Sequence, residues 1–134
     1  MAFDWRDFLL FAHELRNESV ESKRRTSIGR AYYYIYNVAL IEAKKLGYNP
    51  YSNSHLKGGV HKKLWSWCQS HGDPNVVALG VSGSTLHARR ISVDYNQPSA
   101  ASVQQDVQKQ LRDARDFEIL LAQIAKKPAP PPLP

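Results

Sequence analysis

The chain of 134 residues is 43% hydrophobic and 22% charged, which fits a single globular domain with one hydrophobic core. Its net charge of +6 and its pI near 9.6 suit a nucleic-acid partner, although a basic balance alone does not identify one. No window reaches the roughly 18 apolar residues of a membrane span, and the opening residues lack the apolar core of a signal peptide. Cys68 is the single cysteine, which excludes an internal disulfide and leads us to expect a cytoplasmic protein.

Apolar residues recur at steps of three and four along nearly the whole chain, which is the pattern of amphipathic helices. This pattern predicts five helices, at about 4–17, 20–46, 60–71, 75–96 and 99–126. Since no stretch carries a strand pattern, we expect an all-α, up-and-down bundle of four to five helices, formed by one domain over residues 1–126. The proline-rich residues 127–134 cannot continue a helix, and we expect them to form a disordered, extended tail that serves as a linker.

Two of the predicted helices differ from the others in composition. Residues 20–46 are apolar on more than one side, which is typical of a central helix. Residues 75–96 contain Gly80 and Gly83 with serines beside them, and these residue types weaken a helix. We therefore expect this stretch to be helical in one or two pieces.

Four tyrosines fall within five positions of the stretch RRTSIGRAYYYIYNVAL, residues 24–40. Tyr32 belongs to the apolar stripe of its predicted helix, so we expect it in the core. The other three cannot all join it, because successive helix positions are rotated by about 100°, and at least one should face a partner. Core packing, a nucleotide-stacking surface and a subunit interface are the three alternatives for this stretch.

Polar residues flank the tyrosines on the same predicted helix. Arg30 and Asn37 are seven residues apart and therefore share a face, with Tyr33 or Tyr34 between them. An arginine beside a tyrosine can stack on its ring or on a nucleic-acid base. Buried tyrosine hydroxyls also need hydrogen-bond partners, which Arg30 and Asn37 could supply.

The stretch HARRISVDYN, near the end of the fourth predicted helix, places His87, Arg90 and Asp94 on one face. The structural interpretation is an ion pair between Arg90 and Asp94, worth about 0.3–0.5 kcal/mol on a helix surface. The functional interpretation is that Arg90 binds a phosphate.

Signals for other chemistry are weak or missing in the sequence. It contains no glycine-rich phosphate loop, no nucleophile elbow and no serine–histidine–aspartate set with the spacing of a triad. Cys68 and His71 lie three residues apart, but a zinc site needs two more ligands, which His61 or His55 would have to supply. We favour core packing for Cys68 and a helix end for His71, and we expect no metal and no cofactor.

The segments DFLLFAHEL, RRTSIGRAYYYIYNVALIEAKKLG, SHLKGGVHKKLW and LHARRISVDYN, in this order, resemble the HEPN superfamily of small helical-bundle proteins. The similarity covers about residues 4–96, and its most specific pieces are RAYY, which starts at Arg30, and R-x3-D-Y, which starts at Arg90. The resemblance implies a four- to five-helix bundle that commonly forms a homodimer. Many members look like metal-independent ribonucleases, either toxins paired with antitoxins or effectors of phage defence.

The resemblance also implies an active site of the pattern R-x4-6-H, in which the histidine moves the proton of a ribose 2′-hydroxyl and the arginine holds the phosphate. Counting from Arg90, the histidine position holds Asn96, which has no ionisable proton near neutral pH. His87, one turn before Arg90, is one stand-in for it. Arg6 and His13 on the first predicted helix match the pattern literally and form the alternative pair.

We therefore expect a HEPN-type protein that binds RNA or a nucleotide, and we leave metal-independent ribonuclease activity open. Arg90, Asn96 and His87 would form the catalytic group. The residues expected to bind RNA are Arg30, Tyr33, Asn37, Arg89 and Tyr95. The alternative is a non-catalytic interaction subunit or dimerisation module. The expected partners are RNA or a nucleotide, a second copy of the chain, and an antitoxin or defence-complex protein, with no membrane.

Overall fold

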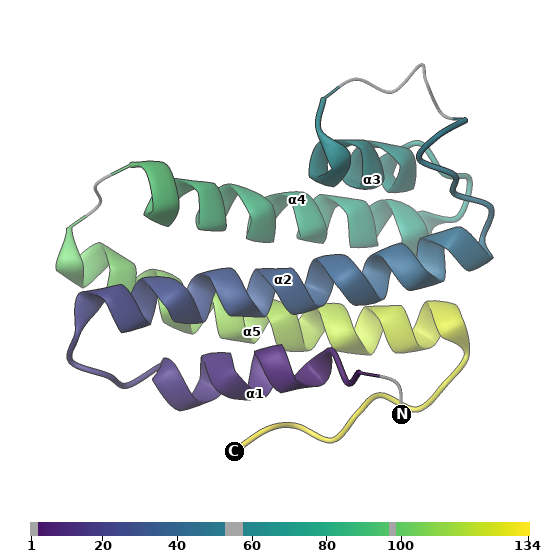
Figure 1. The fold of residues 1–134 in the computed structure, drawn as a ribbon. Helices are drawn as coiled ribbons and strands as arrows, with labels where there is room; N and C mark the ends of the chain where they lie inside the picture. The colour runs from purple at the N-terminus through teal and green to yellow at the C-terminus, as the bar shows by residue number, and fades with distance from the viewer. Residues whose placement is uncertain (1–2, 53–57, 97–98) are drawn as a thin grey trace.

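The computed structural model describes residues 3–52, 58–96 and 99–134. Its five helices are α1 (Arg6–Leu15), α2 (Glu21–Lys45), α3 (Val60–Gln69), α4 (Pro74–Tyr95) and α5 (Ala100–Ala125) (Figure 1). Each predicted range overlaps one helix and the described residues contain no strand, so the prediction of an all-α fold is confirmed. None of these helices combines the length and the apolar content needed to cross a membrane.

Helix α2 contacts all four other helices of the bundle. This helix packs against α1, α4 and α5 and also touches α3, and Figure 1 shows it between α4 on one side and α1 with α5 on the other. Ile28, Ala31, Tyr32 and Ile35 on α2 are completely buried. A helix that meets neighbours on several sides must be apolar on several sides, which explains the composition of this stretch.

Capping residues in the sequence fix where α4 and α5 begin. The side chain of Asp73 accepts a hydrogen bond from the backbone N–H of Asn75 at 2.8 Å, and Pro74 opens α4. The hydroxyl of Ser99 accepts in the same way from the backbone N–H of Ser102 at 3.2 Å, at the start of α5.

Glycines in α4 allow α3 to approach it closely. A Cβ atom at Gly83 would lie 2.3 Å from ring carbons of Trp65, and one at Gly80 would lie 2.8 Å from the carbonyl oxygen of the same residue. Both distances are far below van der Waals contact, so only glycine fits at these positions. The stretch is one continuous helix rather than two pieces, because this packing offsets the weak helix propensity of its glycines.

The proline-rich residues 127–134 are not helical, as their sequence requires. We expected a disordered tail, and the structure places this segment in an extended path beside α1 and α5 (Figure 1). Arg6 and Arg115 donate hydrogen bonds to the carbonyl oxygens of Pro131 and Pro130, and Leu133 packs against the core. These contacts are the physical reason for its defined position.

Candidate nucleic-acid interface

A polar crevice of about 330 Å³ lies between the first half of α2 and the last turns of α4. The two helices run antiparallel here, which brings residues far apart in the sequence to the same place (Figure 1). The crevice is lined by Arg25, Thr26, Gly29, Arg30, Tyr33, Arg90 and Asp94. Three arginines against one aspartate give this crevice, which we call the arginine crevice, an excess of positive charge.

Arg90 lies at the α4 side of the arginine crevice. Its Nε atom is 3.3 Å from Oδ2 of Asp94, and its guanidinium lies over the ring of Tyr32, 5.8 Å from the ring centre. The Arg90 side chain is 29% exposed and the aspartate 36% exposed. A long ion pair between partly exposed groups contributes little stability, so the guanidinium can exchange the aspartate for a phosphate at small cost.

Arg30 and Tyr33 form the α2 side of the crevice. Arg30 is exposed, and its guanidinium lies over the ring of Phe8 at 5.5 Å from the ring centre. Tyr33 is 39% exposed, and its ring packs edge-on against Phe8, with Trp5 next to it. An accessible tyrosine ring beside two arginines is an arrangement on which a nucleic-acid base can stack.

The four tyrosines of the run have separate environments. Tyr32 and Tyr34 are buried, Tyr36 is half-buried, and Tyr33 is exposed. Core packing, one of our three alternatives, therefore holds for most of the run. The ring at one position faces outward, and whether it serves as a stacking surface or as a subunit interface stays a prediction. The helical rotation between successive residues requires this division.

Tyr32, over whose ring Arg90 lies, belongs to a cluster of histidines and aromatic rings. Trp65 donates its indole N–H to the hydroxyl oxygen of Tyr32 at 3.0 Å, and that hydroxyl lies 2.8 Å from Nδ1 of His61. The rings of His61 and His87 are stacked, with their centres 5.1 Å apart, and the ring of Tyr36 lies 4.1 Å from His61. We call these five residues the histidine cluster.

Burial and the neighbouring charge keep both histidines neutral. Burial lowers the pKa of His61 to about 4, with smaller contributions from His87 and Arg90. Burial also lowers the pKa of His87, and Arg90 one turn away adds to the effect. A neutral imidazole can accept a proton, which a protonated one cannot.

His61 is the member of this cluster that the sequence interpretation missed as a site residue. We considered His61 only as a possible zinc ligand. Since α3 and α4 are separate helices, no local pattern in the sequence links His61 to His87. The one signal in the sequence was the tyrosine run itself, whose buried hydroxyl needs a partner.

Three of the expected RNA-binding residues do not line the arginine crevice. Arg89 turns toward α5, where it donates to Oε1 of Gln110 at 2.7 Å and pairs with Asp113 at 3.0 Å. Asn37 donates to the backbone carbonyl of Tyr33 on its own helix. Tyr95 is 76% exposed in the last position of α4.

Arg89 and Arg90 therefore do not lie together as we expected, because adjacent helix positions face directions about 100° apart and only one of them can face α2. Asn96, expected beside Arg90 in the catalytic group, follows the last residue of α4. Its backbone N–H bonds to the carbonyl of Ser92, and its side chain is outside the set that lines the crevice.

The alternative pair on α1 has other partners. Nε of Arg6 is 2.7 Å from the buried carboxylate of Glu118, so this guanidinium is committed to an ion pair. His13 lies on the same helix beside Arg16, and burial lowers its pKa. Arg6 therefore holds an ion pair with Glu118 in this fold, and a catalytic role of Arg6 with His13 stays a prediction.

The zinc interpretation finds no support in the described part of the chain, where no group of three His, Cys, Asp or Glu side chains could hold a metal ion. Cys68 is buried in the core, and burial raises the pKa of its thiol to about 12. His71 accepts a hydrogen bond from the backbone N–H of Asp73 after α3 ends. His55, which the zinc interpretation also required, lies outside the described residues.

Comparison of the chain with protein-family models, with curated proteins and with solved structures finds no match. The fold and the crevice define a small all-helical protein of five packed helices. These comparisons assign the chain to no family.

Proposed function

We propose that this protein binds RNA or a nucleotide in the arginine crevice. The observation that carries the proposal is that Arg30 and Tyr33 from α2 and Arg90 from α4 line one polar crevice on a basic chain. A phosphate between Arg30 and Arg90 would make charge-assisted hydrogen bonds with both guanidinium groups. The neighbouring base would stack on the exposed ring of Tyr33.

The resemblance to the HEPN superfamily supports this proposal, since its two most specific pieces are the ones that meet at the crevice. It also suggests a protein of the cytoplasm that works as a homodimer or with an antitoxin or defence-complex partner. The cytoplasmic location and these partners are proposals that rest on the resemblance and on the single cysteine.

A second candidate function, metal-independent cleavage of RNA, is favoured by the histidine cluster next to Arg90. In this reaction neutral His87 accepts the proton of a ribose 2′-hydroxyl, and the oxygen attacks the adjacent phosphorus. The bond to the 5′-oxygen breaks, that oxygen takes up a proton, and a 2′,3′-cyclic phosphate is left on the other product. Arg90 would stabilise the charge that develops on the phosphate. Asn96 cannot take the proton, so the cluster replaces it in this proposal.

One observation also supports the alternative of a non-catalytic interaction module. Phe3, Leu10, Phe11 and Tyr33 expose 39–59% of their surface near α1 and the start of the chain. An interface on this side would cover Tyr33 and would therefore compete with RNA.

The binding proposal is tested by fluorescence anisotropy with a labelled single-stranded RNA oligonucleotide. We expect Arg90→Ala and Arg30→Ala each to weaken binding about five- to tenfold and to reduce the slope of log K against log salt by about 0.7. Arg112→Ala is the matched control, because Arg112 is 67% exposed on α5 and lies outside the crevice. Equal losses in all three variants would point to diffuse charge attraction and would contradict the crevice as the binding site.

A further inference from the structure

The proline-rich tail occupies a groove whose arginines are positioned for backbone carbonyl groups. Arg6 Nη2 donates to the carbonyl oxygen of Pro131 at 2.5 Å, and Arg115 Nη1 donates to that of Pro130 at 2.6 Å. Consecutive prolines have no N–H and offer only acceptors, so donors on both sides of the groove match this kind of segment. We call this surface, formed by α1 and α5, the tail groove.

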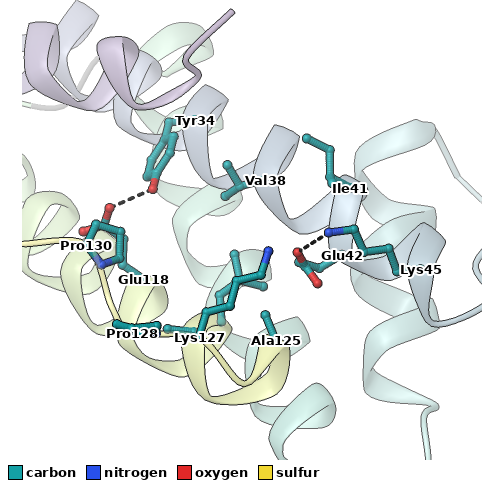
Figure 2. A pocket seen from close by; sticks show the side chains of 12 residues that line it. Tyr34, Val38, Ile41, Glu42, Lys45, Glu118, Ala125, Lys127, Pro128 and Pro130 are labelled. Atoms are coloured by element: carbon teal, nitrogen blue, oxygen red, sulfur yellow. Dashed lines mark hydrogen bonds and ion pairs between the residues drawn. The ribbon is translucent and has the colours of Figure 1, made fainter. Parts of the chain in front are cut away.

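Both arginines are fixed by one buried carboxylate. Glu118 is 3% exposed and pairs with Arg6 at 2.7 Å and with Arg115 at 3.2 Å. The hydroxyl of Tyr34 donates to the same carboxylate at 2.7 Å, and Figure 2 shows Pro130 beside this pair. Because Glu118 holds the two guanidinium groups in place, they need little further ordering when they bind a carbonyl.

The far end of the tail is held by an apolar contact. Leu133 packs against the core from outside and lines a cavity of about 390 Å³ together with Val107, Leu111 and His13. Carbonyl hydrogen bonds at one end and a leucine at the other give the groove a direction and a sequence preference.

The tail also borders an unfilled cavity next to the tail groove. A cavity of about 320 Å³ remains beside Pro128 and Pro130, between the end of α5 and the Val38 side of α2 (Figure 2). An occupant with larger side chains than proline and alanine would bury more apolar surface there.

The turn that ends α5 and leads into the tail is unfavourable for its residue type. Lys126 ends α5 with φ 56° and ψ 45°, the left-handed conformation, and the backbone N–H of Lys127 closes the turn on the carbonyl of Ala122 at 2.9 Å. Glycine is the usual residue at this position, because a side chain with Cβ disfavours the conformation.

We propose that the tail groove is a binding site for an extended proline-rich segment in which a leucine follows three prolines, and that residues 128–134 are its intramolecular occupant. A segment of the same chemistry from another polypeptide displaces the tail. This site is separate from the arginine crevice and does not depend on the proposed RNA binding.

The test uses the full chain and a fluorescein-labelled peptide KKPAPPPLP, which copies residues 126–134. In a variant with Pro130→Gly, Pro131→Gly and Leu133→Asp, the tail loses its preorganised backbone and its apolar anchor, and the groove is free. Because the docked tail competes at an effective concentration of roughly millimolar, we expect the peptide to bind this variant at least about tenfold more tightly than the unaltered chain. The peptide and the chain are both basic, so charge attraction does not produce such binding.

Two controls identify the contacts. A peptide with aspartate in place of the leucine is expected to bind at least about tenfold more weakly, and Arg115→Ala in the released variant is expected to lower the affinity by a similar factor. Self-association of the unaltered chain that Leu133→Asp abolishes would identify the tail of a second copy as the occupant in trans.

Circular dichroism checks that the released variant keeps its helices, and the single variant Leu133→Asp repeats the comparison if it does not. No binding to a folded, released chain at peptide concentrations up to about 1 mM would overturn the proposal, since the groove would then hold its own tail only through the covalent connection. Equal binding of the two peptides would overturn it as well.

Discussion

The hydroxyl of Tyr32 lies between the indole N–H of Trp65, at 3.0 Å, and Nδ1 of His61, at 2.8 Å. The indole can only donate, so the hydroxyl oxygen accepts from Trp65 and its single proton is directed to His61. His61 Nδ1 must therefore be an acceptor, which assigns the proton of this imidazole to Nε2. One buried tyrosine of α2 thus bonds two residues of α3 and fixes the tautomer of a histidine beside Arg90.

This arrangement predicts that acid destabilises the fold through His61. Its pKa is lowered to about 4 by burial and by the nearby His87 and Arg90, whereas an unfolded histidine has a pKa of about 6.5. Between these two values the unfolded state binds more protons, so stability is complete above pH 6.5 or so and falls as the pH drops toward 4. Urea unfolding at pH 7.5 and at pH 5 measures the change.

The matched variant is His61→Asn, whose side-chain oxygen can still accept the proton of Tyr32. With the partial exposure of His61 taken into account, we expect the unaltered chain to lose about 1 kcal/mol more stability than this variant on acidification. An identical pH dependence in both proteins would mean that His61 is protonated as easily in the folded state as in the unfolded one.

The contact between Gly83 and Trp65 predicts an asymmetric response to two glycine-to-alanine changes. Alanine at Gly83 would place its Cβ 2.3 Å from the indole ring, and we expect Gly83→Ala to destabilise the fold by about 1–3 kcal/mol. Gly29 on α2 has no atom within 4 Å of such a Cβ, so Gly29→Ala should stabilise the protein by about 0.5–1 kcal/mol through helix propensity. Thermal unfolding of both variants tests the close packing of α3 on α4, which equal shifts in Tm would contradict.

The periodicity of apolar residues was sufficient to predict the helices, because the period of a helix is a local property of the chain. The single continuous α4 was less certain, since the reason for Gly80 and Gly83 is the ring of Trp65 on another helix. The same limit applies to the candidate site. Helix geometry requires that one tyrosine of the run face outward, but only the packing of α1 and α5 against α2 selects Tyr33.

Contacts between residues far apart in the sequence also determine those parts of the site that the sequence could not predict. Arg89 and Arg90 are equivalent in a sequence pattern, and the partner on α5 decides that Arg89 belongs to the buried network. His61 comes from a helix that carries no part of the expected R-x4-6-H pattern, so its place beside His87 follows from the tertiary fold alone. The tail likewise has partners on α1 and α5 that proline content does not reveal.

Arg89 and Arg90 are accordingly expected to respond differently to substitution. The side chain of Arg89 is 14% exposed and donates a hydrogen bond to Oε1 of Gln110. The amide nitrogen of Gln110 in turn donates to the carbonyl oxygens of Ile28 and Leu86. Arg89→Ala leaves buried acceptors without this donor and should lower the free energy of unfolding by about 1–3 kcal/mol.

For Arg90→Ala, which removes one weak ion pair and a long contact with the ring of Tyr32, we expect a loss below about 1 kcal/mol. Urea unfolding and RNA anisotropy on both variants separate the two roles: stability should fall mainly with Arg89, and RNA affinity mainly with Arg90. The reverse pattern would make Arg90 the structural residue and would remove the basis of the proposed crevice.

The histidine cluster makes the cleavage proposal testable without any assumption about partners. Labelled RNA is incubated with the protein in the presence of a metal chelator, and products that end in a 2′,3′-cyclic phosphate are measured. If His87 acts as the base, His87→Ala should reduce the rate at least about 100-fold. The rate should also fall at acidic pH, because the reaction needs the neutral imidazole whose pKa is lowered by burial and by Arg90.

His13→Ala is the matched control, since His13 is a partly buried histidine with a lowered pKa on a different helix. Loss of cleavage in His13→Ala with full activity in His87→Ala would move the reaction to the pair of Arg6 and His13. That outcome would require Arg6 to leave the buried carboxylate of Glu118, so it should be accompanied by a strong dependence of the rate on Tyr34, which donates to the same carboxylate. RNA binding without cleavage in any variant would leave the arginine crevice as a binding site only. The histidine cluster would then serve packing, because its stacked rings fill the space between α2, α3 and α4.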